Sequence, residues 1–201
     1  VIRCDADDYL EPNALQLLLD ATEGGIYDVV IAPYYAVYPE YRKLVKFKTK
    51  PQTLNDMYMD ALNFSVWNKL LRRRLLVDNA ITQFEGLDCW EDLGVVSRVL
   101  SLRPRLKCID TPVYNYVRNP KRKTLTRSSR NRLLEDHLAV CQLVEDWLKE
   151  RGLEHEFEEF LLHLKFCAKV KMLRGRRKNV ARWKRTYSEV NSRVMSLRHI
   201  A

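Results

Sequence analysis

The sequence predicts an α/β domain followed by a helical extension, and three observations support this fold class. From residue 1 to residue 118, strand-like and helix-like segments alternate, an order typical of α/β domains. After Asn119 only helical periodicity remains. The charge divides at the same place, because residues 1–118 carry 15 basic and 16 acidic side chains whereas residues 119–201 carry 20 and 10. We therefore expect an α/β domain over 1–127 and a basic helical extension over 128–201.

The composition argues against two broad classes of protein. Hydrophobic residues make up 46% and charged residues 30% of the 201 residues, so we expect a folded core rather than a disordered chain. No apolar run approaches the roughly 20 residues that a membrane-spanning helix needs. The five cysteines form no C-x-x-C pair, so they predict neither a zinc knuckle nor a thiol redox motif, and they favour the reducing cytoplasm.

Local patterns predict the elements in order. Val1–Cys4 is a short β-type run, and Pro12 suits the first turn of a helix that Gly24 and Gly25 end. We next expect an apolar strand over 27–32, a polar and aromatic stretch to Tyr38, an edge strand over 41–48 and a helix over 53–62. A strand or helix start over 67–71 with a short helix after it, a helix over 91–100 and a strand over 105–117 interrupted by Pro112 should follow. The last elements expected are helices over 129–151, 154–174 and 178–197. Helices between the strands favour a largely parallel sheet.

The most distinctive motif is Asp5-Ala6-Asp7-Asp8, at the carboxyl end of the first expected strand. In open parallel sheets, ligands bind in the crevice beyond the carboxyl ends of the strands. Alternate carboxylates there can hold Mg²⁺ or Mn²⁺, which usually takes one or two carboxylates together with phosphate oxygens of the substrate. Such an ion stabilises a diphosphate leaving group. The alternative is that one of these aspartates caps the following helix.

A second acidic pair, Glu91-Asp92, opens a later helix after a loop. The helix dipole favours ionised carboxylates at this position. An ionised carboxylate can act as a general base if a hydroxyl lies within hydrogen-bond distance. Plain N-terminal capping is the alternative. If both acidic motifs serve one reaction, they must face each other across a shared cleft.

Several blocks, in this order, resemble the family 2 glycosyltransferases. Residues 1–15 resemble the D-x-D-D segment of that family, and Trp67–Leu70 resembles its W-x-K-L block. Glu91-Asp92 resembles its E-D motif, and Pro112–Arg118 its last strand. The resemblance covers residues 1–127 and implies an A-type, Rossmann-like fold with transfer of a sugar from a nucleotide-sugar donor, with inversion and a divalent metal.

The resemblance also implies roles for single residues. Asp5 and Asp7 would approach the nucleotide, the diphosphate and Mg²⁺ or Mn²⁺, with Asp7 the better metal ligand, and Asp8 would lie near the donor sugar. Asp92 would deprotonate the acceptor hydroxyl, with Glu91 shaping the site.

Three further residues match blocks that lie near the donor in the family: Trp67, Lys69 and Arg118. For Trp67, a place in the core is the alternative. The family's domain normally starts well before the D-x-D segment, with strands that form the pocket for the nucleotide base. We therefore expect this chain to be an N-terminally truncated domain that is poorly active by itself.

The cationic segment 165–185 carries ten basic residues and no acidic one. Since basic residues attract anionic lipid by about 1 kcal/mol each, and the resemblance implies a glycan or lipid-linked acceptor, contact with the inner face of the membrane is one expectation. A helical face packed on the core is another. Nucleic acid is disfavoured because no binding motif for it is present. The competing function is a non-catalytic basic module that binds anionic surfaces. Exposed strand edges would also favour a homo-oligomer.

Overall fold

The structure is a computed structural model that describes residues 1–57, 64–118, 130–173 and 180–193. Its strands form two sheets. The first sheet has the order β5 (Lys69–Leu71), β2 (Val29–Ile31), β6 (Leu106–Cys108). The second has the order β1 (Tyr9–Leu10), β7 (Tyr114–Val117), β3 (Tyr34–Val37), β4 (Arg42–Val45).

The pairing is mixed, so the expectation of a largely parallel sheet is wrong. Only β2–β6 and β3–β7 are parallel among the described pairs, while β2–β5, β3–β4 and β1–β7 are antiparallel. The expected strand over 105–117 divides at Pro112 into β6 and β7, which belong to different sheets. Strand β3 lies in the stretch that the sequence left without an element. It joins β4 in a hairpin, which is antiparallel by construction.

The helices follow the expected order with some differences in extent. They are α1 (Ala14–Asp20), α3 (Arg73–Val77), α4 (Glu91–Ser101), α6 (Arg130–Lys149), α7 (Glu158–Val170), α8 (Val180–Arg185) and α9 (Glu189–Arg193), with 3₁₀ turns η1 (Leu54–Asp56) and η2 (Lys171–Leu173). Only η1 represents the helix expected over 53–62, and residues 58–63 lie outside the described ranges. The helix expected over 178–197 is interrupted where Tyr187 adopts a left-handed backbone (φ +47°).

The first residues are not a strand, contrary to expectation, but they line the edge of a sheet. The Val1 amino group donates to the Leu71 carbonyl (2.6 Å), and the Leu71 N–H donates to the Val1 carbonyl (2.8 Å). This reciprocal exchange is that of an antiparallel pair. Because β5 is itself antiparallel to β2, the chain from Val1 runs in the direction of β2 and leads to Asp5 at the carboxyl end of that strand.

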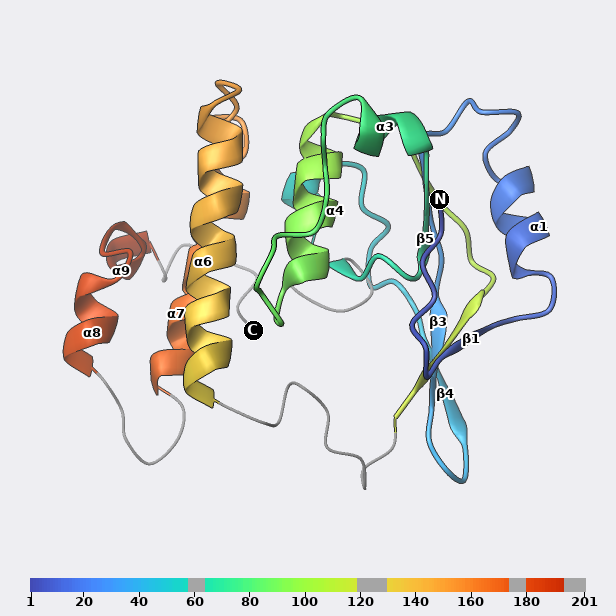
Figure 1. The fold of residues 1–201 in the computed structure, drawn as a ribbon, viewed down its shortest axis with the longest axis horizontal. Helices are drawn as coiled ribbons and strands as arrows, with labels where there is room; N and C mark the ends of the chain where they lie inside the picture. The colour runs from blue at the N-terminus through green and yellow to red at the C-terminus, as the bar shows by residue number, and fades with distance from the viewer. Residues whose placement is uncertain (58–63, 119–129, 174–179, 194–201) are drawn as a thin grey trace.

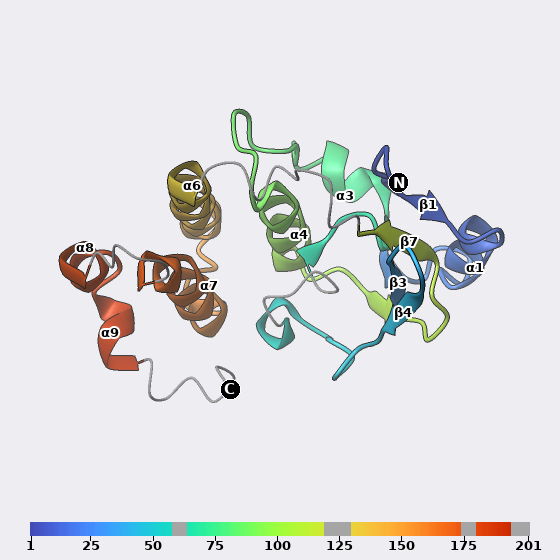
Figure 2. The ribbon, with the colours of Figure 1, turned by 90° about the horizontal axis from the view of Figure 1, so that it is seen from below.

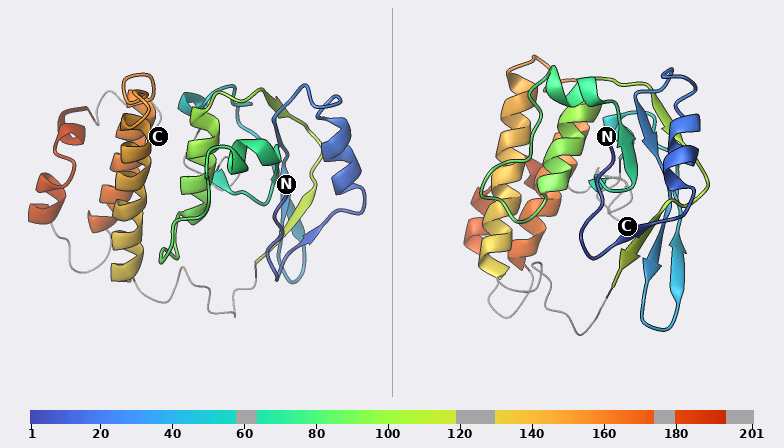
Figure 3. Two further views of the ribbon diagram at one scale, coloured as in Figure 1. Left: turned by 45° about the horizontal axis from the view of Figure 1, so that its top comes forward. Right: turned by 45° about the vertical axis from the view of Figure 1, so that its right-hand side comes forward.

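The elements form successive layers, with α1 on one side of the sheets and α4 on the other (Figure 1). Strand β2 supplies both faces: Val29 and Ile31 pack with α4, while Val30 packs with the side of α1. Helices α6 and α7 lie beside α4 on its outer side, followed by α8 and α9 (Figures 2 and 3). No helix within the described ranges combines the length and the apolar character needed to cross a membrane.

The helical extension shares its core with the α/β region. One cluster of buried side chains joins Val96 of α4 to Val144 of α6 and Leu164 of α7. The Trp147 indole N–H donates to the Ser101 hydroxyl (3.0 Å) across the same contact. The domain boundary expected at 127–128 lies outside the described residues, and the division into two domains stays a prediction.

The basic segment 165–185 is partly internal. Lys165 is buried and pairs with Glu145 and Glu189, each at 2.9 Å. Lys169 is fully buried and donates to the Asn191 side chain (2.6 Å). Arg182 binds the Glu135 carboxylate through two hydrogen bonds of 2.7 and 2.8 Å. Three cations of this segment therefore bind other parts of the helical extension, as the alternative of a helical face packed on the core predicts, and contact of the segment with a membrane stays a prediction.

All five cysteines have free thiols in the structure, and they are not all buried. Cys89 and Cys141 lie in the core, whereas Cys4 is exposed beside the acidic motif.

The shared core predicts that both regions unfold together. Leu148→Ala, at a fully buried position of α6, should lower the free energy of unfolding by about 2–5 kcal/mol. Leu143→Ala on the same helix, where the side chain is 39% exposed, should cost about 0.5 kcal/mol or less. Urea titrations followed by tryptophan fluorescence and by far-UV circular dichroism measure both. Two separate transitions would contradict a common core.

Candidate active site

The first acidic motif is a turn fixed to β7. The Asp8 N–H donates to the Asp5 carbonyl (3.1 Å). The Tyr114 hydroxyl accepts from the Asp5 N–H (3.0 Å) and donates to Asp8 Oδ2 (2.9 Å), and the Val117 N–H donates to Asp8 Oδ1 (2.8 Å). Burial raises the pKa of Asp8, although these two hydrogen bonds oppose the shift. Both Asp8 oxygens accept hydrogen bonds from β7, so Asp8 fixes the turn, and its expected place near the donor sugar stays a prediction.

Arg3 joins the two acidic motifs. Its Nε lies 3.6 Å from Asp5 Oδ1, and its Nη1 lies 3.4 Å from Asp92 Oδ1, although Arg3 and Asp92 are 89 positions apart in the chain. The Asp5 charge also raises the pKa of Glu91, as a secondary effect. The juxtaposition of the two motifs, which the sequence led us to expect, is therefore present in the fold.

The Glu91-Asp92 pair begins α4 immediately after Trp90, whose left-handed backbone (φ +62°) turns the chain into the helix. Asp92 Oδ2 accepts a hydrogen bond from the Val66 N–H (3.0 Å), and the Asp92 side chain is 22% exposed. Burial raises the pKa of Asp92, with the Val66 hydrogen bond and the Arg3 charge acting in the opposite direction. Burial also raises the pKa of Glu91. The helix dipole suggested readily ionised carboxylates, and burial outweighs it.

Trp67 lies in the core, so the prediction that it contacts the donor is not supported. Its indole is 4% exposed and stacks on the rings of Tyr114 (4.4 Å between centroids) and Tyr116 (5.4 Å). Tyr34 meets it edge-on at 4.8 Å. Trp67 therefore holds the tyrosine whose hydroxyl fixes the acidic turn.

Lys69 is also buried, although the sequence suggested a donor contact. Its Nζ donates to the Ser65 carbonyl (2.6 Å) and to Asn68 Oδ1 (2.8 Å), and the residue is fully buried. Its charge nevertheless lowers the pKa of Asp92 slightly, against the effect of burial. Lys69 is thus a positive charge placed behind the site rather than in it.

Arg118 is exposed at the end of β7, on the side of the acidic turn. Its backbone N–H donates to the Val37 carbonyl (2.7 Å), and its guanidinium carbon lies 5.2 Å from the centre of the Tyr116 ring. Burial raises the pKa of Tyr116; the Arg118 charge lowers it, and the charges of Asp8, Asp7 and Asp5 raise it further. Tyr116 therefore lies close to both Arg118 and the aspartates of the acidic turn. The Arg118 side chain is accessible to an anion beside this turn.

The donor set fits an open metal site better than a closed one. In the part of the chain that the structure describes, no three His, Cys, Asp or Glu side chains converge as a metal cage. Asp8 is engaged by β7, which leaves Asp7, which is exposed, and Asp5, whose side chain is 38% exposed. One or two carboxylates completed by substrate phosphate oxygens are what Mg²⁺ usually takes in enzymes.

The sequence missed the roles of Arg3 and of the Tyr114 hydroxyl. Arg3 lies two residues before Asp5 in an extended segment, where alternate side chains share a side. That spacing signalled only that Arg3 and Asp5 are close. The partner of Tyr114 depends on the register of β1 with β7, in which Leu10 faces Tyr114.

Comparisons with known proteins identify similar folds. No family model matches the chain. It is 24% identical over 194 residues to the cholesterol galactosyltransferase of Borreliella burgdorferi, a match that covers 86% of this chain and 52% of that protein. The chain thus spans about half the length of this curated relative.

Two solved structures of S. aureus TarS, residues 1–349, have a similar fold. The complex with UDP gives a TM-score of 0.67 at 19% identity, covering 98% of this chain and 58% of that one. The complex with UDP-GlcNAc gives 0.61 at 18% identity, covering 98% and 59%. The predicted α/β fold class is confirmed: the chain has a mixed α/β fold, similar to that of TarS and consistent with a Rossmann-like A-type fold.

Removing one hydroxyl tests the support of the acidic turn. Tyr114→Phe should lower the free energy of unfolding by about 1–3 kcal/mol, because the half-buried Asp8 carboxylate loses a donor and the Asp5 N–H loses its acceptor. Tyr116→Phe is the control, since its hydroxyl makes no hydrogen bond within the described residues. Equal stability of both variants in urea titration would argue against the turn's dependence on Tyr114.

Proposed function

We propose that the chain is the site-bearing part of a glycosyltransferase that moves a sugar from a nucleotide-sugar donor to an acceptor hydroxyl. The observation that carries this proposal is the contact of Arg3 with both Asp5 and Asp92, because it brings a donor-side and an acceptor-side carboxylate to one place. The curated relative is named as a galactosyltransferase, and the similar TarS structures hold UDP and UDP-GlcNAc. Because the chain spans about half of that relative, activity, donor and acceptor all belong to the proposal.

Asp92 is the proposed general base. Its carboxylate is oriented by the Val66 N–H, which leaves Oδ1 toward Arg3 and the acidic turn. A raised pKa makes a carboxylate a stronger proton acceptor, closer to the pH at which the enzyme works. The acceptor oxygen bonds to the anomeric carbon as its proton passes to Asp92. The bond from that carbon to the diphosphate breaks on the opposite side, and the nucleoside diphosphate leaves with the electron pair. This single displacement inverts the anomeric centre.

The donor side is assigned to Asp7, Asp5 and Arg118. Asp7 and Asp5 would hold Mg²⁺ or Mn²⁺, which supplies charge neutralisation to the departing diphosphate. Arg118 is an exposed cation beside the same turn and would bind the diphosphate directly. Glu91, whose pKa burial also raises, would border the acceptor without accepting the proton. We further propose a glycan or lipid-linked acceptor that is met in the cytoplasm, at the inner face of the membrane.

Two substitutions test the assignment in the full-length protein. Asp92→Asn should lower kcat by about 10²–10⁴-fold, because the base is lost while the hydrogen bond from Val66 can persist. Asp7→Asn should reduce transfer and raise the Mn²⁺ concentration required. Asp20→Asn, an exposed aspartate of α1, is the matched control and should leave the rate unchanged. The readout is release of nucleoside diphosphate from a panel of nucleotide sugars with Mn²⁺. Transfer that survives both changes would refute the assignment.

The pH profile tests the link between Arg3 and the base. The Arg3 charge lowers the pKa of Asp92, so Arg3→Gln should raise that pKa further. Since the base acts in its ionised form, the acidic limb of the kcat profile should move to higher pH. Arg73→Gln, on the exposed surface of α3, should leave the profile in place. A lower rate with an unmoved acidic limb would mean that Arg3 does not act through Asp92.

A further inference from the structure

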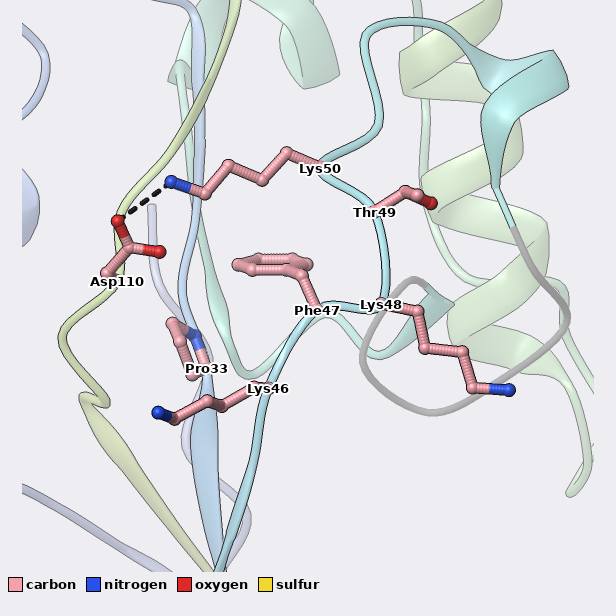
Figure 4. Close-up of a pocket in the computed structure, with 7 residues that line it drawn as sticks. All are labelled: Pro33, Lys46, Phe47, Lys48, Thr49, Lys50 and Asp110. Carbon is pink, nitrogen blue, oxygen red and sulfur yellow. Dashed lines mark hydrogen bonds and ion pairs between the residues drawn. The ribbon is translucent and has the colours of Figure 1, made fainter.

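A cavity of about 300 Å³ is lined by none of the residues assigned to transfer (Figure 4). It is formed by the chain that follows β4, together with one residue after β2 and one in the link between β6 and β7. Its lining residues are Pro33, Lys46, Phe47, Lys48, Thr49, Lys50 and Asp110. None of them is among the site residues that the sequence predicted.

The cavity lies where α/β folds place their ligands. Pro33 comes two residues after β2 and Asp110 two residues after β6, and these strands are parallel. The chain that leads to Asp5 runs in the same direction as β2, so Asp5 leaves the sheet at the same edge. Because ligands of such sheets bind beyond the carboxyl ends of the strands, one extended substrate could reach both places.

The charges of the cavity favour an anion. In Figure 4 the Lys46 and Lys50 side chains extend on either side of the Phe47 ring toward Pro33 and Asp110. The Lys50 ammonium pairs with Asp110 at 2.8 Å, whereas Lys46 is exposed and has no ion pair within the described residues. Two ammonium groups against one carboxylate leave one positive charge uncompensated.

The ion pair itself is exchangeable. The Asp110 side chain is 82% exposed and that of Lys50 is 44% exposed. Pairs in such surroundings contribute little to stability, so an incoming anion can take the place of Asp110 at small cost. Lysine is also well suited to bind an anionic group as a point charge.

Phe47 gives the cavity a fixed apolar wall. It is half-buried and packs against both core clusters, so its ring is held from behind. Pockets of this kind combine an apolar surface with a few placed polar groups. A ring face flanked by two ammonium groups suits the C–H face of a sugar or polyol that carries a negative charge.

We propose that this cavity is an acceptor subsite that binds an anionic substituent, a phosphodiester or a carboxylate, on the carbohydrate acceptor. The proposal deepens the proposed function and rests on it for the identity of the ligand as an acceptor. Lys46 and Lys50 bind the charge, Phe47 packs against the carbohydrate, and Asp110 releases Lys50 when the anion enters.

Direct binding tests the subsite without requiring transfer. The probes are a phosphodiester-linked glycerol oligomer, a glucuronate-containing oligosaccharide and a neutral oligosaccharide of matched length, each titrated calorimetrically at low salt. Lys46→Gln and Lys50→Gln should each weaken binding of the anionic probe by about tenfold, near the 1.4 kcal/mol of one charged contact. Asp110→Asn should strengthen it, because the competing carboxylate is gone.

Lys48→Gln is the matched control, because it removes the same charge from a side chain that points away from Lys46 and Lys50 (Figure 4). It should change binding less than twofold. Preference for the phosphodiester or for the glucuronate probe identifies the anion. The proposal fails if the neutral probe binds equally well, if neither anionic probe binds, or if Lys48→Gln weakens binding as much as Lys46→Gln does.

The two proposals can fail separately. If the full-length parent protein releases no nucleoside diphosphate from any nucleotide sugar of the panel, yet binds the anionic probe in a Lys46-dependent way, the glycosyltransferase is refuted and the anion site remains. If anionic acceptors are glycosylated and Lys46→Gln leaves their KM unchanged, the subsite is refuted and the enzyme remains. The expected result for Lys46→Gln is a raised KM for anionic acceptors with kcat unchanged.

Discussion

The guanidinium of Arg3 is the interaction on which the site depends. Two carboxylates from distant parts of the chain, Asp5 and Asp92, lie at its two sides at 3.6 and 3.4 Å. Without a cation between them, like charges so close would repel, and burial already disfavours the ionised form of Asp92. Arg3 supplies that cation, and it lets the two carboxylates lie at one place, as the proposed reaction requires. It is also held by an extended segment at the edge of β5, so its position follows from the sheet.

The aromatic core holds the acidic turn in a defined position. Trp67 is buried against Tyr114, and the Tyr114 hydroxyl holds the backbone of Asp5 and the carboxylate of Asp8. Trp67 thus fixes Tyr114, and Tyr114 fixes the acidic turn. Asp7, in the same turn, is exposed. A residue of a sequence motif that suggests a ligand contact, such as Trp67, can therefore serve to pack the core behind the site. These supporting residues hold the backbone of Asp5 and the carboxylate of Asp8 in place, as packed side chains behind a polar site commonly do.

Local patterns were sufficient for some elements and not for others. The helix opened by Glu91-Asp92 lies where its apolar periodicity predicts it, and the strand around Val30 lies where its continuous apolar run predicts it. In both cases neighbouring residues alone show which side chains are buried. The burial of Lys69 could not be predicted in this way, since the Ser65 carbonyl, which accepts its hydrogen bond, comes within reach only when the intervening turn has folded. Strand direction was misjudged for the same reason: pairing is a long-range property, and the hairpin of β3 with β4 has no helix between its strands.

The cations of the helical extension and those of the β4 region serve different ends. Lys165 and Lys169 are buried among acceptors of their own chain, and removing a buried lysine from its partners would leave those groups unsatisfied. These two lysines hold α7 against its neighbours. Because α7 packs on α6 and α6 packs on α4, they also support the helix whose first turn contains Asp92. Lys46 has no such commitment within the described residues and lies exposed beside a cavity. Net charge alone does not show which cations can bind a ligand, because a cation is available only where the fold has not already paired it.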